Sequence, residues 1–210
     1  EFTSIEFYWA YKTYKDLIEL TKEYFEYLFK NLNLPTTLPY GELQVDFTKF
    51  SEIPLIQSLY EIGDVPKDIV EDKEKILEFL KENKLEANPK LNLGQLQGEL
   101  FDEFVEDKLI NPTFVIDYPG DLKPLANQNE DGTAKVAQLI IAGAEITNQY
   151  SELVDPIKQR ELLTLQSKAK EMGDKEAMEI DEEFLAAMEY GMPQMTGFGM
   201  GIDRLVAIFT

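Results

Sequence analysis

The segment AQLIIAGAEITNQYSEL, at residues 137–153, constrains the fold of this chain more than any other stretch. It has two runs with the composition of β-strands, and Ala142-Gly143 between them is suited to a tight turn. Two such runs joined so closely predict an antiparallel hairpin. Other strand-like runs lie at residues 2–11, 41–47 and 112–118, and a last strand leads into a glycine-rich turn before the final helix.

The remaining segments have apolar residues at helical spacing, or the start and stop residues of helices. They are residues 12–32, a charged helical insertion at about 61–110, Asp155-Pro156 to about Met172-Gly173, about Asp181 to Gly191, and the residues after Gly201. Strands and helices do not alternate as βαβ units. The sequence therefore predicts an α+β fold with a mostly antiparallel sheet flanked by helices.

The composition limits the chemistry that such a fold can perform. Hydrophobic residues make up 44% of the 210 residues, which is enough for a packed core. Cysteine and histidine are absent, which excludes disulfides, thiolate metal sites and the commonest general base. The formal net charge of −20 argues against a stand-alone nucleic-acid-binding protein and is compatible with cationic ligands and divalent metals. No apolar run approaches the length of a membrane span.

Period-2 alternation places a carboxylate and a phenol on one face of the strand at residues 2–11. This face holds Phe2, Ser4, Glu6 and Tyr8. The other face holds Thr3, Ile5, Phe7 and Trp9, and we expect it to join the core. A carboxylate in such an apolar strand needs a partner, so Glu6 either binds a cationic ligand or forms a structural ion pair.

The hairpin carries oxygen-bearing side chains suited to a hard cation. Regular pairing around a two-residue turn puts Ile140 opposite Glu145 and Gln138 opposite Thr147. Gln138 and Glu145 then become diagonal neighbours, which either hold a metal ion or belong to an ordinary polar outer face.

Glu145, Asn148 and Glu152 do not follow the two-residue period of a strand. If all three side chains enter one cleft, the strand must have a bulge near residues 147–149. Alternatively, Glu152 is a solvated residue in the loop before the helix at Pro156.

The stretch GFGMGIDR, at residues 197–204, combines three glycines with an arginine. Gly197, Gly199 and Gly201 allow a close backbone approach. Arg204 can present its planar guanidinium to a phosphate or a base ring. The alternative is a packing turn with a surface arginine, because the pattern differs from the known glycine-rich nucleotide loops.

Several blocks of the sequence resemble one enzyme family. EFTSIEFYWAY resembles the second half of motif 2 of the class II aminoacyl-tRNA synthetases, and GFGMGIDR resembles their motif 3. Four blocks between them resemble the lysyl branch of this family in order and spacing. They are NPTFVIDYP, the PLA at 124–126, GAEITNQYSELVDPIKQR and DEEFLAAMEYGMPQ. The resemblance covers almost the whole chain and implies a class II synthetase catalytic core.

The resemblance implies a role for each matching residue. Phe2 matches the aromatic ring that stacks on the adenine of ATP, and Arg204 matches the catalytic arginine on the other side of that base. Glu145 matches a magnesium ligand. Gln138 stands where the family usually has a glutamate ligand, so its amide oxygen would bind the metal more weakly. The residues that match lysine-binding positions are Glu6, Tyr8, Asn148, Tyr150, Glu152 and Gly201. Of these, Glu152 matches the counter-charge of the substrate ε-ammonium.

The function implied by the resemblance is ATP-dependent activation of lysine to lysyl-adenylate and transfer to tRNA(Lys), with Mg²⁺ as cofactor. It also implies a cytoplasmic homodimer. Two alternatives stay open: a paralogue that modifies a translation factor protein instead of tRNA, and a catalytically silent binding module of the same fold.

Family features that precede the middle of motif 2 have no counterpart in the sequence. Motif 1, the anticodon-binding domain and the motif 2 arginine that grips the α-phosphate are absent. We therefore expect residues 1–210 to be part of a catalytic domain, with little or no activation activity by themselves.

Overall fold

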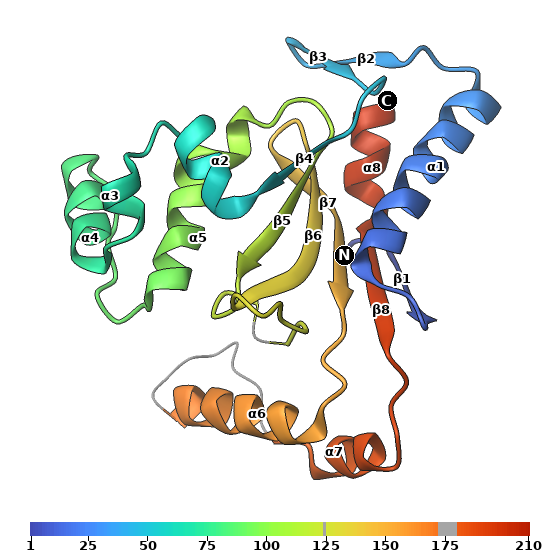
Figure 1. Cartoon of the computed structure of the whole chain (residues 1–210). Coiled ribbons are helices and arrows are strands. Elements are labelled where there is room, and N and C mark those ends of the chain that lie inside the picture. The colour runs from blue at the N-terminus through green and yellow to red at the C-terminus, as the bar shows by residue number, and fades with distance from the viewer. Residues whose placement is uncertain (124, 172–179) are drawn as a thin grey trace.

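Figure 1 shows the computed structural model, which describes residues 1–123, 125–171 and 180–210. Its main element is a six-stranded sheet. In spatial order the strands are β1 (Ser4–Ala10), β8 (Met195–Gly201), β7 (Ala144–Ser151), β6 (Thr133–Ile141), β5 (Thr113–Pro119) and β4 (Ser51–Pro54). Neighbouring strands are antiparallel except for β4 and β5, which are parallel. The predicted α+β fold with a mostly antiparallel sheet is confirmed.

Helices lie on both faces of this sheet (Figure 1). One face is covered by α1 (Tyr14–Leu32) and α8 (Ile202–Phe209). The connection from β4 to β5 contains α2 (Leu55–Glu61), α3 (Lys67–Val70), α4 (Lys73–Glu82), α5 (Leu93–Phe104) and the 3-10 turn η1 (Glu106–Lys108). Between β7 and β8 lie α6 (Pro156–Glu171) and α7 (Glu182–Glu189). The predicted helix end at Met172-Gly173, and Pro124 of the PLA block, lie outside the described residues.

Alternate residues of the sheet divide the apolar core in two. Leu139 and Phe198 point to the face of α1 and α8, where Phe25 of α1 is 1% exposed. Val136 and Ile140 point to the opposite face and pack in the cluster formed with α2–α5. Because α2–α5 pack at the β4–β5 end of the sheet, the same face of β7, β8 and β1 is left for a site (Figure 1).

The sequence of β8 explains why that face stays open. Glycine alternates with larger residues along this strand, so Phe198 and Met200 enter the core on the α1 side. The glycines Gly197 and Gly199 leave the opposite face without side chains. The sequence predicted a glycine-rich turn here, but the strand continues to Gly201 because β1 and β7 pair with it on both sides.

The face of β1 predicted to be core is only partly buried. Phe7 stacks on Phe198, with 4.9 Å between the ring centroids. Ile5 and Trp9 remain 49% and 38% exposed and Thr3 is also exposed, so the prediction is wrong for these three residues. The physical reason is that β1 is one of the two edge strands of the sheet and has β8 as its single neighbour there.

Two short segments also differ from the sequence prediction. The strand predicted at 41–47 is the second half of a separate hairpin, formed by β2 (Thr37–Tyr40) and β3 (Leu43–Asp46). The strand β4 and the helix that follows it at Leu55 were not predicted, because four residues ending in proline are too few to display a period. None of the helices in the described part of the chain has the length and apolar character needed to cross a membrane.

Candidate functional site

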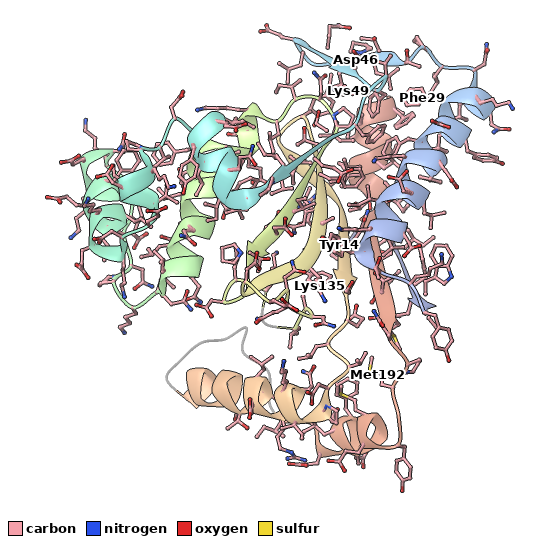
Figure 2. All side chains as sticks on the ribbon, in the orientation of Figure 1. Tyr14, Phe29, Asp46, Lys49, Lys135 and Met192 are labelled. Atoms are coloured by element: carbon pink, nitrogen blue, oxygen red, sulfur yellow. The ribbon has the colours of Figure 1, made fainter. Side chains whose placement is uncertain are left out.

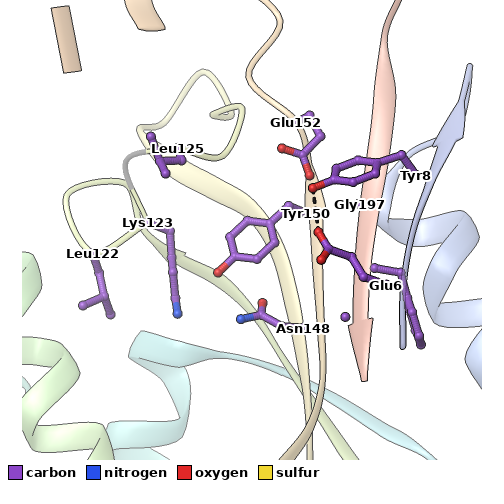
Figure 3. A pocket seen from close by; sticks show the side chains of 11 residues that line it. Glu6, Tyr8, Leu122, Lys123, Leu125, Asn148, Tyr150, Glu152 and Gly197 are labelled. Carbon is purple, nitrogen blue, oxygen red and sulfur yellow. Dashed lines mark hydrogen bonds between the residues drawn. The ribbon is translucent and has the colours of Figure 1, made fainter. Parts of the chain in front are cut away.

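A cavity of about 510 Å³ lies over the bare face of β8 (Figure 3). Its lining residues come from β1, β7, the residue after β7, β8 and the loop before β6, and they are Glu6, Tyr8, Leu122, Lys123, Leu125, Asn148, Tyr150, Glu152, Gly197, Phe198 and Gly199. Five of the six predicted lysine-binding residues thus meet in one cavity. The sixth, Gly201, pairs with Ser4 at the end of β8 and is not part of this lining.

A β-bulge in β7 brings the polar side chains of this strand to the cavity. Ile140 pairs with Glu145 and Leu139 pairs with Thr147, so Ile146 is the extra residue. Gln138 consequently faces Asn148. The predicted pairing of Gln138 with Thr147 is wrong, and the bulge lies before the predicted position at 147–149.

The bulge resolves the irregular spacing in the sequence. After it, Asn148 and Tyr150 point into the cavity together with Glu152, which follows the strand. The alternate residues point to α1 instead: Gln149 donates a hydrogen bond to Oγ1 of Thr21, and Ser151 accepts one from the backbone N–H of Tyr14. Asn148 Oδ1 is buried and has no hydrogen-bond partner within the described chain.

Two rows of residues cross the cavity floor. Glu6, Gly199 and Asn148 are aligned across β1, β8 and β7, and Tyr8 and Tyr150 flank Gly197 in the next row. The Tyr8 hydroxyl donates a 2.7 Å hydrogen bond to Oε1 of Glu6 (Figure 3). This bond, with burial, raises the pKa of Tyr8 to about 12.

Glu152 lies at the same end of the cavity as Glu6 and Tyr8 (Figure 3). Burial, together with the nearby charge of Glu6, raises the pKa of Glu152 to about 7. The ion pairs that the described residues form include neither Glu6 nor Glu152. The structural ion pair considered for Glu6 is therefore not found there, and two carboxylates converge on a space that suits a cation.

Lys123 lies across the cavity from these carboxylates, and sequence reasoning missed it (Figure 3). Its Nζ is 5.0 Å from the centroid of the Tyr118 ring, and burial lowers the pKa of its ammonium. No local signal could have identified it, because a lysine in a polar loop is ordinarily solvated. The cavity is thus acidic at one end and basic at the other.

The predicted metal ligands line a second cavity of about 330 Å³, next to the first. Gln138 and Glu145 lie together there, and the amide Nε2 of Gln138 donates a hydrogen bond to the Glu145 carboxylate. Burial raises the pKa of Glu145. Within the described residues no group of three acidic side chains is placed to hold a metal ion.

The predicted ATP-binding residues lie outside both cavities. Arg204 is exposed, and its Nη1 donates a 2.7 Å hydrogen bond to the backbone oxygen of Glu145. Phe2 is 81% exposed. The chain brings the two close, since the N–H of Ile202 bonds to the backbone oxygen of Thr3, but the cation–π contacts of the described residues do not include the Phe2 ring with Arg204.

Figure 2 shows side chains with nitrogen and oxygen atoms on all the elements in view. What distinguishes the cavity is the convergence of Glu6, Tyr8 and Glu152 on one space that is open to solvent.

Comparison with known proteins extends these observations. Residues 1–210 match the family model of tRNA synthetases class II (D, K and N). The chain is 67% identical over 212 residues to a lysine--tRNA ligase of Aliarcobacter butzleri. That alignment covers 100% of this chain and 42% of the ligase. It is 49% identical over 213 residues to the lysine--tRNA ligase of Campylobacter jejuni strain RM1221, and 48% identical over 212 residues to that of Helicobacter hepaticus. These alignments cover all of this chain and 42% and 41% of those proteins, so the chain spans about two fifths of the length of the curated relatives it matches.

Proposed function

The chain belongs to the class II tRNA synthetases of the D, K and N group, and we propose that its cavity binds lysine for ATP-dependent activation and transfer to tRNA(Lys). The relatives named lysine--tRNA ligase support the choice of lysine over the other two amino acids of the group. They also favour tRNA over a protein as the acceptor.

The observation that carries this proposal is the acidic end of the cavity. Glu6 and Glu152 converge there, and the hydroxyl of Tyr8 lies beside them. A substrate side chain ending in an ammonium would supply the missing positive charge and donate hydrogen bonds to these oxygens. An aspartate or asparagine substrate would bring a carboxylate or a neutral amide to the same place, which two carboxylates disfavour.

The reaction needs no general base from the protein. The lysine carboxylate is already ionised, and its oxygen forms a bond to the α-phosphorus of ATP while the bond from that phosphorus to the bridging oxygen of pyrophosphate breaks. The products are lysyl-adenylate and pyrophosphate. Residues of the chain would act by positioning: Glu152, Glu6 and Tyr8 fix the lysine, Phe2 stacks on the adenine, and Arg204 binds the nucleotide. The absence of histidine is consistent with this chemistry.

Glu145 and Gln138 fit a magnesium ion that is held mainly by ATP and water. Both side chains offer oxygen ligands, and Mg²⁺ keeps several waters where the protein supplies few ligands. When bound, the ion would neutralise charge on the phosphates.

Lysine-dependent exchange of pyrophosphate into ATP tests the proposal. We expect the full-length protein to catalyse exchange with lysine but not with norleucine, which lacks the ε-ammonium, or with aspartate. Exchange with aspartate and not with lysine would contradict the proposal. A second assay compares purified tRNA with a translation factor protein as acceptor of radiolabelled lysine, and transfer to tRNA is the expected result.

We further propose that the protein is a cytoplasmic homodimer, as the resemblance to the family implies. Light scattering after gel filtration would test the dimer, and fractionation of cells would test the location.

A further inference from the structure

The strand β8 crosses the cavity between Tyr8 and the segment that ends at Glu152. Gly197 pairs with Tyr8 on one side and with Tyr150 on the other. A Cβ atom at Gly197 would overlap Oε1 of Glu152 and would come within 3.1 Å of Cε1 of Tyr8. The Glu152 carboxylate therefore occupies the space that any other residue at this position would fill.

Backbone conformation does not explain the glycine. The φ angle of Gly197 lies outside the left-handed region, so an L-residue can adopt the same backbone. Gly199, two residues further on the same face, shows the difference. A Cβ there would lie 3.9 Å from the backbone oxygen of Asn148, which is an ordinary contact.

We propose that Gly197 is a positioning residue, whose missing side chain lets the Glu152 carboxylate lie across β8 beside Glu6 and Tyr8. This inference rests on the proposed lysine site and names the residue that shapes its specificity. The atom that a methyl group would meet is the free end of a flexible side chain. Gly197→Ala therefore folds and moves the carboxylate instead of the backbone.

A double-mutant cycle in the full-length protein tests this role. We expect Gly197→Ala to weaken lysine binding on the order of tenfold or more, because a charge-assisted hydrogen bond is lost, while ATP binding is unchanged. In a Glu152→Ala background the same substitution should weaken lysine binding less than about twofold. Calorimetry gives both affinities. Wild-type affinity in Gly197→Ala, or an equal loss in both backgrounds, would overturn the inference.

A second measurement does not depend on lysine. Burial raises the pKa of Glu152 to about 7, so a displaced and better solvated carboxylate should titrate closer to an ordinary glutamate. Carbon-13 NMR titration should show this decrease in Gly197→Ala and no change in the matched control Gly199→Ala. An unchanged Glu152 titration in Gly197→Ala contradicts the inference. If the Glu152 pKa decreases in Gly197→Ala but the wild-type protein does not bind lysine, only the proposed function is contradicted.

Discussion

At the scale of single residues, the main consequence concerns the protonation of Glu152. Its pKa of about 7 exceeds that of an ordinary glutamate, so the folded protein favours the protonated form. This contribution to stability is present at low pH and is lost as the pH rises through 7. Binding an ammonium group through an ion pair requires the deprotonated form of Glu152. Lysine affinity should therefore rise about tenfold from pH 6 to pH 8, following the ionised fraction of the carboxyl.

The control for this pH dependence is Glu152→Gln, which has no titrating group. We expect it to bind lysine weakly at both pH values and to be more stable than the wild type at pH 8, since the buried charge is removed. Calorimetry and thermal unfolding at the two pH values measure these effects. A pH dependence that persists in the glutamine variant would mean that another group controls binding.

Tyr8 is expected to act through its hydrogen bond to Glu6. Tyr8→Phe removes the hydroxyl that donates to Oε1 of Glu6 and leaves the ring in place. Lysine affinity should decrease by about three- to tenfold, with little change in thermal stability because Tyr8 is 59% exposed. Isothermal calorimetry with lysine and with ATP separates the two substrates. An equal loss of ATP affinity would show that the ring, and not the hydroxyl, had been disturbed.

At the scale of elements, the edge strand β1 carries two site residues but has one well-packed aromatic. Phe7 stacks on Phe198, whereas its neighbour Ile5 on the same face is half exposed. We expect Phe7→Ala to destabilise the protein by roughly 1.5–3 kcal/mol, because it removes a partly buried ring. Hydrogen exchange should become faster in β1 before it does in β6, and lysine affinity should fall as Glu6 and Tyr8 lose their support.

The matched control for Phe7 is Ile5→Ala, which removes a smaller and more exposed side chain from the same strand face. We expect less than half of the destabilisation of Phe7→Ala, as measured by urea unfolding. Equal effects of the two substitutions would contradict the view that the Phe7–Phe198 stack anchors the strand.

The elements also show which features a sequence can predict. The hairpin at 137–153 was predictable because its turn and its β-branched runs are local signals. The position of its bulge was not, because pairing of β7 with both β6 and β8 decides which residue is extra. The convergence of Glu6, Tyr8 and Glu152 was predictable only through family resemblance. Lys123 lies in a loop that lines the cavity, and a loop has no periodic pattern of apolar residues from which its position could be predicted.

At the scale of the whole molecule, β8 explains why one face of the sheet packs in the core and the other forms the site. Its larger residues complete the core beneath α1 and α8, while its glycines leave a floor without side chains. The helices α2–α5 then cover only the far end of that face. A site forms where the sheet is buried on one side and uncovered on the other, so stability and binding depend on different faces of the same strands.

The net charge of the molecule leads to a prediction about salt. With 40 acidic and 20 basic residues, the folded chain carries a formal charge of −20, and folding brings these like charges closer together. Raising the ionic strength from 0.01 to 0.1 M shortens the screening length from about 30 to about 10 Å and weakens this repulsion. The thermal unfolding midpoint at pH 8 should therefore rise by a few degrees, on the order of 2–5 °C. The same series at pH 5, where part of the carboxylates are protonated, should show a smaller rise. A midpoint that falls with salt at pH 8 would mean that attractive ion pairs, and not net repulsion, dominate the electrostatics of this fold.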